Sequence, residues 1–412
     1  MKLSLAYIDR NLGKLNRHFF SKNESSTLKK YLIIALCLPF LVSFGRLASG
    51  GFDLTYFIGA GEYLVLKQKL VYPLKVIKDS RGYDGISYYQ LALDPTNRDH
   101  HAFGLMSNLA YRKQRILYPV LSHLLSFGNP HWVPGAMIMV NLLAISFSIL
   151  IAYKLIVAYN SYPIYILLFA GLIGSHIALT KNLAETLEGF FLTLIAYFFI
   201  KKKYFLIFLA SCGALFTRET SVLIVGPLSI ILLFALYKEK KLFSLNALLA
   251  CLPILLIVTW KIYIYLDLGG HHVGDIQSIP FKGMLSSQVL GFKNFWYTSN
   301  DDQYAFLIYY VYNIVFTLWI FYTLIKALSK IKIKNDNWNL WIAISLLVSL
   351  VFALFLSESI YRSDLSYGRV FNGILILTVL FLIVRRQKVQ PLYLLSTFTL
   401  YAFAYGRLIF LD

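Results

Sequence analysis

The sequence predicts an all-α polytopic membrane protein, and three observations carry that prediction. Apolar residues make up 58% of the chain and charged residues 14%, a composition typical of membrane proteins. Apolar runs near or above the roughly 20 residues that a spanning helix needs recur from Tyr31 to the C-terminus. Basic residues gather in short segments between these runs. The formal net charge of +19 therefore indicates membrane orientation and not a nucleic-acid partner.

The apolar runs predict about eleven transmembrane helices. In chain order they cover residues 31–48, 133–158, 163–180, 184–200, 204–217, 220–237, 242–266, 303–325, 338–356, 368–384 and 391–411. The run at 204–217 is the shortest. Residues 1–30 are polar and basic and lack the apolar core of a cleaved signal peptide, so we expect the first span to direct insertion.

Basic clusters fix the expected orientation. With a cytoplasmic N-terminus, the clusters at 201–203, 238–241, 326–334 and 385–388 all fall on the cytoplasmic side. The opposite side then receives the longer connections, at residues 49–115, 267–302 and 357–369, together with the turns at 181–185 and 217–220. Nearly all the acidic residues of chemical interest lie in these external segments.

The chain divides into three parts by this pattern: a basic cytoplasmic N-terminus (1–30), a transmembrane module with a long first external loop (31–237), and further transmembrane helices (238–412). We expect short interfacial helices in the first external loop and just after it. The stretch "RILYPVLSHLLSFG" is apolar on helical spacing but too short to cross a membrane, and Pro119 interrupts it.

Two acidic motifs stand in the first external loop. Asp53, in "GFDLTYFIGAGEYL", directly follows the first span, and Asp84, in "GYDGISYYQLALDP", lies between Gly82 and Gly85, which allow a tight turn. An acid beside glycine is often only a turn residue or a helix cap, and at each position this interpretation stands beside the functional one. A pair of such motifs in one loop favours carboxylate chemistry at the membrane surface.

Cations on the external side are the second indication, because the orientation rule disfavours them there. They lie near the outer ends of different predicted spans and comprise Arg46, Lys181, Arg218, Lys261, Arg362 and Arg369. Extension toward lipid headgroups explains some of them. An anion site explains the set, and a phosphate suits arginine best because the planar guanidinium binds two oxygens at once.

Other polar residues of the external side allow two interpretations each. Glu185 and Glu188 share a helix face, whereas Glu219 adjoins Arg218 and could simply neutralise it. The pair His271 and His272 is adjacent in sequence, so its side chains diverge and the spacing predicts no metal site. A further set reads as interfacial aromatics or as sugar platforms: Tyr88, Tyr89, Trp132, Trp260 and Trp296.

The motifs resemble known families. "LTKNLAETLEGF" through "LFTRETSVL", with an acid after the first span and a long first external loop, is similar to the GT-C superfamily of membrane glycosyltransferases that use polyprenyl-phosphate sugars. Within it, "YDGISYYQLALDP" and "YRKQRILYPVLSHLLSFG" resemble bacterial cell-surface glycopolymer formation proteins. "DLTYFIGAGEYLVLKQKLVYP" resembles the opening of polyprenol-dependent mannosyltransferases, whose leading acid maps onto Asp53. The likeness covers roughly residues 46–227.

The resemblance implies a GT-C-like fold, with 31–237 as the catalytic module, in a bacterial inner (cytoplasmic) membrane with its active site on the periplasmic side. The implied reaction is inverting transfer of a sugar from a polyprenyl-phosphate donor to a lipid-linked or cell-surface glycan. No cofactor is required, although a divalent metal could assist, and no metal ligand is assigned.

The implied site combines three groups of residues. The catalytic carboxylates are Asp53 and Asp84, with Asp53 preferred as the general base. The donor-phosphate ligands are Arg218, Arg362, Arg369 and Lys261. The remaining substrate contacts are Glu185, Glu188, Glu219, Tyr88, Tyr89, Arg115, His271 and His272.

Two rival functions share the span count. A flippase for lipid-linked sugars should show paired repeats and charges buried in mid-span, which are scarce here. An O-antigen-type polymerase or ligase usually carries its largest external loop late in the chain, whereas here that loop comes first.

Overall fold

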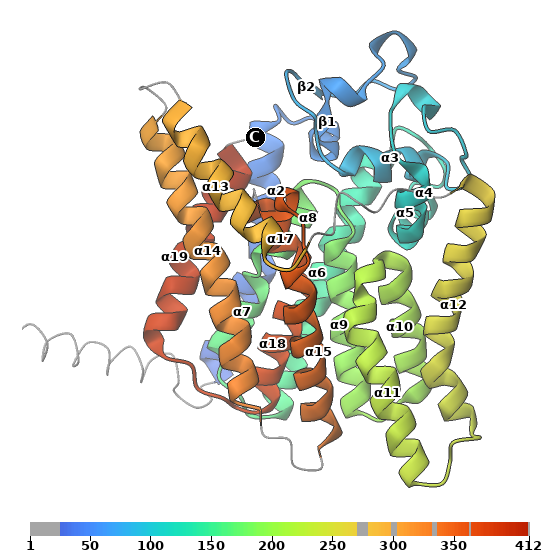
Figure 1. Ribbon diagram of the computed structural model, residues 1–412, viewed down its shortest axis with the longest axis vertical. Coiled ribbons are helices and arrows are strands. Elements are labelled where there is room, and N and C mark those ends of the chain that lie inside the picture. Colours follow the sequence, from blue (N-terminus) through green and yellow to red (C-terminus); the bar gives the residue numbers. More distant parts are fainter. Residues whose placement is uncertain (1–24, 270–278, 298–302, 332–335, 362–363, 411–412) are drawn as a thin grey trace, which may run out of the picture.

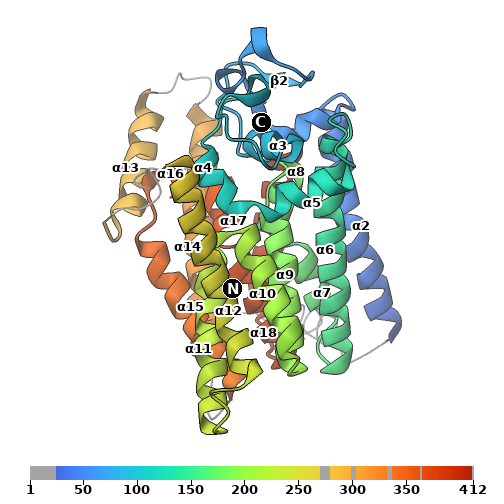
Figure 2. The same ribbon diagram turned by 90° about the vertical axis from the view of Figure 1, so that its right-hand side faces the viewer.

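The computed structural model describes residues 25–269, 279–297, 303–331, 336–361 and 364–410. These residues form a bundle of helices, and the only strands among them are two residues long. Figure 1 shows the long helices running side by side, with β1, β2, α3 and α4 gathered at one end of the bundle. The view turned by 90° shows the same segments at that end (Figure 2).

Six helices in the described part of the chain are long and apolar enough to cross a membrane. The elements that contain them are α2 (Ser25–Ser49), α6 (Val133–Ala158), η6 with α11 (Glu219–Lys238), α12 (Leu245–Leu268), α14 (Gln303–Ser329) and α15 (Asn337–Leu354). The chain is therefore an all-α membrane-embedded protein, as the sequence predicted. The orientation and the number of crossings stay predictions.

The other predicted spans correspond to shorter or interrupted helices. The run at 163–180 forms α7 (Ile164–Ala170) and α8 (Ile173–Thr180), which are separated by Gly171 and Leu172. The helices α9 (Glu185–Ile200), α10 (Tyr204–Thr217) and α18 (Asn372–Val384) have 16, 14 and 13 residues. These lie among the longer helices: α9 packs on α6, α10 and α18. The last helix is α19 (Pro391–Phe410), which packs on α2 and α8.

The first predicted external loop folds into short elements at one end of the bundle. In chain order they are η1 (Leu54–Ile58), β1 (Ala60–Gly61), η2 (Glu62–Leu64), η3 (Lys67–Lys69), β2 (Val76–Ile77), α3 (Gly85–Leu93), η4 (Ala102–Gly104), α4 (Leu109–Arg112) and η5 (Lys113–Arg115). The stretch that contains Pro119 forms α5 (Leu117–Leu125), nine residues long, so it is too short to cross.

Two glycines bring Asp84 against the bundle. Gly82 has a φ of +67°, which favours glycine, and a Cβ there would lie 2.3 Å from the backbone nitrogen of Gly61. At Gly85, a Cβ would lie 2.3 Å from the carbonyl oxygen of Lys181. Only residues without a side chain fit these positions. The N-terminus of α3 therefore sits directly on the turn between α8 and α9.

The C-terminal part differs from the sequence prediction at residues 267–302. That segment was expected to be a loop, but it contains the helix α13 (Lys282–Tyr297), which packs on α14 and on α16 (Glu358–Tyr361). The contact is close because Gly283 lies against the carbonyl oxygen of Leu356. After α16, α17 (Asp364–Val370) packs on α8 and carries Arg369 toward the α8–α9 turn.

Candidate functional site

Charged side chains from five separate parts of the chain meet at the end of the bundle that carries α3 and α4. We call them the arginine–carboxylate cluster, which consists of Asp84, Arg112, Arg115, Glu185, Glu188, Arg218, Glu219 and Arg369. Four arginines face four carboxylates. Ionic groups are seldom buried unless they are paired, so such a concentration marks this end as the candidate site.

Breaks between helices place these residues. Arg218 has extended backbone (φ −157°) between α10 and η6 (Glu219–Ser221), so the chain turns sharply at this arginine. Asn182 has a φ of +49° in the turn that ends α8, and Glu185 then opens α9. Acidic residues in the first turn of a helix are favoured by the helix dipole, which suits both Glu185 and Glu188.

Asp84 lies between two guanidinium groups. Arg112 Nη2 donates to Asp84 Oδ1 at 2.5 Å, and Arg369 Nη1 donates to Asp84 Oδ2 at 2.8 Å. Burial alone would raise the pKa of this carboxyl, but the two arginines outweigh burial and hold the pKa well below its usual range. Asp84 is therefore ionised, and each of its two oxygens accepts a hydrogen bond from an arginine.

Arg115 and Glu219 form what we call the closed pair. Arg115 Nε and Nη2 donate to the two carboxylate oxygens of Glu219 at 2.8 and 2.7 Å. Arg115 also donates to the hydroxyls of Tyr88 at 3.2 Å and Tyr111 at 2.5 Å. The arginine is only 4% exposed. A bidentate pair with this many hydrogen bonds leaves little capacity for a ligand.

Arg218, Glu185 and Glu188 form what we call the open group, because their contacts are longer. Arg218 lies 3.5 Å from both Glu185 and Glu188, and it donates to the carbonyl oxygen of Arg369 at 3.3 Å. Ser221 Oγ donates to Glu188 at 2.7 Å. Neither carboxylate oxygen of Glu185 accepts a hydrogen bond from any described residue, although Glu185 is 1% exposed.

The arginines of the cluster retain unused donors. Among the described residues, no acceptor faces Nη1 of Arg112 or the Nε atoms of Arg218 and Arg369. Arg369 also joins the two parts of the cluster, since its Nη1 lies 2.8 Å from Asp84 and 3.6 Å from Glu185. Unsatisfied donors on buried guanidiniums are costly, so this arrangement is suited to an anion that would supply acceptors.

Tyrosine rings line the cations. The guanidinium of Arg369 lies 5.0 Å from the ring centroid of Tyr83, and the ammonium of Lys181 lies 5.8 Å from the same ring. Tyr111 lies in the same way beside Arg112 and Arg115, at 4.9 and 4.8 Å. Cation–π contacts of this kind hold the cations without neutralising their charge.

Asp53 is placed differently from Asp84. It is the N-cap of η1, where its Oδ1 accepts hydrogen bonds from the backbone nitrogen and the hydroxyl of Thr55, both at 2.8 Å. Thr55 in turn accepts from the backbone nitrogen of Lys75 at 2.8 Å. Among the described residues, no ion pair joins Asp53 to the cluster. These contacts are those of a cap that shapes the loop.

Other predicted site residues lie inside or outside the cluster. Tyr88 contacts Arg115, whereas Tyr89 is buried in α3 among apolar residues. Lys261 lies on α12 with an exposed side chain, and Arg46 stacks on Tyr56, 3.8 Å from the ring centroid. The structure does not bring these last two side chains into the cluster. The predictions for His271, His272 and Arg362 fall outside the described residues.

Sequence reasoning missed four members of this region. Arg112 donates a hydrogen bond to Asp84, and Ser221 donates one to Glu188. The rings of Tyr83 and Tyr111 lie beside the guanidinium groups of Arg369 and Arg115. Helical spacing could have found Arg112, because it precedes Arg115 by three residues and so lies on the same face. Nothing local in the sequence marks Ser221.

A small cavity adjoins the carboxylate of Glu188. The cavity, of about 30 Å³, reaches Glu188 between α11, α15 and α18, and most of its lining is apolar. No three His, Cys, Asp or Glu side chains come together as metal ligands in the part of the chain that the structure describes. The unused donors of Arg112, Arg218 and Arg369 are the feature of the cluster that favours an anionic ligand.

Comparison of the chain with protein-family models, with curated proteins and with solved structures gives no significant match.

Proposed function

We propose that this protein is an inverting membrane glycosyltransferase that transfers a sugar from a polyprenyl-phosphate donor to a lipid-linked or cell-surface glycan on the external face of the membrane. The observation that carries the proposal is the arginine–carboxylate cluster at one end of an apolar helix bundle. A lipid-phosphate sugar needs both parts: guanidinium donors for its phosphate, and a bundle in contact with the bilayer that holds its chain.

The open group is the part of the cluster suited to the donor phosphate. Arg218 and Arg369 have unused donors, and their contacts with Glu185 are 3.5 and 3.6 Å long, so a phosphate could accept from these donors while both arginines stay beside Glu185. The cavity beside Glu188 opens the same group toward an apolar lining. In the transition state, guanidiniums at this position would stabilise the charge that develops on the leaving phosphate.

Asp84 is assigned here as the proton acceptor because it is in contact with Arg369, one of the proposed phosphate ligands. A general base works best with a pKa near the working pH, and two arginines hold the pKa of Asp84 far below that range. A donor phosphate that drew Arg369 away would remove part of this effect and raise the pKa. Donor binding would thus activate the base. The sequence placed Asp53 first, and that assignment stays a prediction which the variants below decide.

The test is sugar transfer by the purified chain in lipid nanodiscs, measured with a panel of radiolabelled polyprenyl-phosphate sugars and an extract of cell-envelope glycolipids as acceptor. Wild type should transfer one of the sugars. Asp84→Asn should lose on the order of a hundred- to ten-thousand-fold in rate, the usual contribution of a general base. Asp53→Asn should retain most activity, because asparagine also caps helices well.

One outcome would overturn the choice of the general base, and another would overturn the proposed activity. If Asp53→Asn abolishes transfer while Asp84→Asn is nearly wild type, the protein is still a glycosyltransferase but its general base is Asp53. If the wild-type chain transfers no sugar in the panel but still moves labelled lipid-phosphate sugar between leaflets, the activity is that of a flippase.

A further inference from the structure

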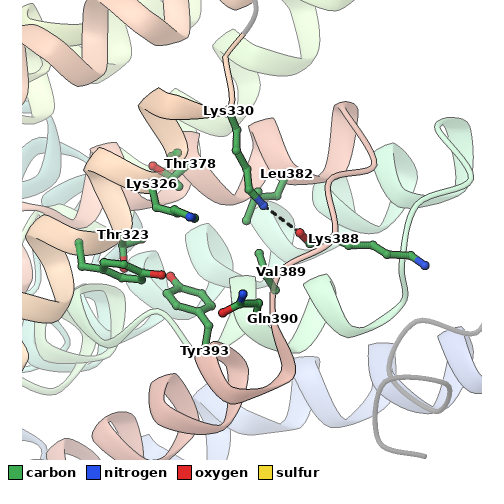
Figure 3. Close-up of a pocket in the computed structure, with 11 residues that line it drawn as sticks. Thr323, Lys326, Lys330, Thr378, Leu382, Lys388, Val389, Gln390 and Tyr393 are labelled. Carbon is green, nitrogen blue, oxygen red and sulfur yellow. Dashed lines mark hydrogen bonds between the residues drawn. The ribbon is translucent and has the colours of Figure 1, made fainter. Parts of the chain in front are cut away.

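A second polar site lies at the end of the bundle away from the arginine–carboxylate cluster. It is a cavity of about 310 Å³ between the last turns of α14, the end of α18 and the start of α19. Figure 1 shows the chain passing from α18 to α19 at the end of the bundle opposite β1 and β2. We call it the lysine cavity, after Lys326 and Lys330, whose side chains line it (Figure 3).

The lysine cavity has an excess of positive charge. No aspartate or glutamate is found among its described lining residues. Lys326 and Lys330 are four residues apart, a spacing at which like charges repel. Burial, and then the charge of Lys326, lowers the pKa of Lys330. A bound anion would relieve this repulsion.

The two lysines keep donors for such an anion. Lys330 Nζ donates to the carbonyl oxygen of Lys388 at 2.8 Å, which uses one of its three hydrogens. Figure 3 shows Lys326 and Gln390 pointing into the same space, whereas the side chain of Lys388 points away from it. Lys388 instead lies 5.8 Å from the ring centroid of Tyr162. Two ammonium groups and one carboxamide therefore face the cavity.

Hydroxyl groups complete the lining. Thr323 Oγ1 donates to the carbonyl oxygen of Trp319 at 2.8 Å and lies 3.0 Å from the hydroxyl of Tyr393, which donates to it, and Thr378 donates to the carbonyl oxygen of Ile374 at 2.8 Å. Because these hydroxyl hydrogens are already used, the donors left for the oxygens of a phosphate are those of the two ammonium groups and the carboxamide.

Exposed apolar residues adjoin the cavity. Tyr322, which lines it, is 48% exposed, and on the same helix Leu318 and Ile325 are 62% and 57% exposed. Leu395 of α19 is 60% exposed. In a membrane-embedded bundle such residues face lipid, so the cavity opens where acyl chains lie. A lipid could place its phosphate inside while its chains follow α14.

We infer that the lysine cavity binds the phosphate of an anionic membrane lipid. The evidence is the pair of lysines with no carboxylate among the described lining residues, the cavity of about 310 Å³ beside them, and the adjoining exposed apolar residues. The inference does not rest on the proposed glycosyltransferase activity, since it concerns the other end of the bundle. Under the predicted topology, it would place an anionic lipid at the cytoplasmic leaflet.

The test is equilibrium binding of fluorescent phosphatidylglycerol to the purified full chain in non-ionic detergent, with phosphatidylcholine as the zwitterionic reference. The double variant Lys326→Gln/Lys330→Gln should reduce the preference for phosphatidylglycerol roughly ten- to thirty-fold, on the basis of the usual contribution of two basic residues. The control is Lys238→Gln/Lys240→Gln, two exposed lysines that do not line the cavity. It should leave the preference unchanged.

A conservative variant separates charge from folding. Lys326→Arg/Lys330→Arg keeps both charges, so it should retain the preference even if the glutamine variant is unstable. Equal preference in wild type and in a folded glutamine variant would overturn the inference. If glycerol 1-phosphate displaced the lipid with the same affinity as phosphatidylglycerol, the acyl chains would add nothing and the cavity would be a site for free phosphate, which also overturns it.

Discussion

The closed pair and the open group lie side by side in one cluster, yet they are built differently. Arg115 meets Glu219 through two hydrogen bonds of 2.7 and 2.8 Å and adds two tyrosine hydroxyls. Arg218 meets Glu185 and Glu188 only at 3.5 Å, and Glu185 accepts no hydrogen bond from the described residues. The difference indicates that the closed pair maintains the structure and the open group is available to a ligand.

Removal of the closed pair should have the largest effect on stability. Arg115→Ala leaves the partly buried carboxylate of Glu219, whose side chain is 16% exposed, without its partner; loss of a partner from a buried pair typically costs about 3 to 5 kcal/mol in the free energy of unfolding. Denaturant unfolding in detergent measures it. The control is Arg98→Ala, because Arg98 is exposed and its pair with Asp267 should contribute about 0 to 1 kcal/mol. Equal losses in the two variants would show that Arg115 is not structural.

Asp84, which lies between the two arginines Arg112 and Arg369, should come next. Asp84→Asn should lower the free energy of unfolding by about 2 to 3 kcal/mol, since it weakens two charged hydrogen bonds. The folded pKa of Asp84 lies below the unfolded value of about 3.9, so this contribution is complete above that pH and is lost on further acidification. The difference between wild type and variant should therefore stay constant from about pH 8 to about pH 5. A difference that faded across that range would mean that Asp84 is not held by the arginines.

Arg218→Lys tests the open group with little disturbance of charge. Lysine keeps the positive charge but loses the planar fork, so binding of polyprenyl phosphate should weaken roughly tenfold while unfolding changes by less than about 1 kcal/mol. Isothermal titration in nanodiscs measures the affinity. Arg98→Lys is the matched control and should bind as wild type does. If Arg218→Lys binds polyprenyl phosphate normally, the open group does not hold the phosphate.

The smallest effect is expected at Asp53, outside the cluster. Asp53→Ala removes the cap of η1 and should cost about 1 kcal/mol, whereas Asp53→Asn should cost close to nothing because asparagine accepts the same hydrogen bond from Thr55. Thermal unfolding of the two variants provides the comparison. Similar, large losses in both would show that the negative charge of Asp53 matters beyond capping.

The sequence predicted more of the fold than of the site. Apolar runs located the helices, because burial in lipid or protein leaves a signal over many residues. They could not reveal that 163–180 breaks at Gly171, or that α13 forms within an expected loop, since both depend on packing against other helices. Charge placement on the external side predicted Arg218 and Arg369 as members of one site, and the structure places both in the cluster.

The ranking of the carboxylates depended on information that the sequence lacks. Asp53 and Asp84 both follow glycine-containing turns, and their surroundings differ only through distant residues: Thr55 and Lys75 in one case, Arg112 and Arg369 in the other. Lys261 is a second case in which the sequence could not place a side chain. Its position near the end of a predicted span did not reveal that the side chain is exposed. Which of the two acids is the base stays a prediction.

The most direct test of the central claim is a structure of the chain with polyprenyl phosphate bound. We expect the phosphate within hydrogen-bond distance of Arg218 and Arg369, and we expect the 2.8 Å contact between Arg369 and Asp84 to be broken. Asp84 would then be free to accept a proton. A phosphate bound elsewhere, with Asp84 still held by both arginines, would contradict the proposed role of the cluster.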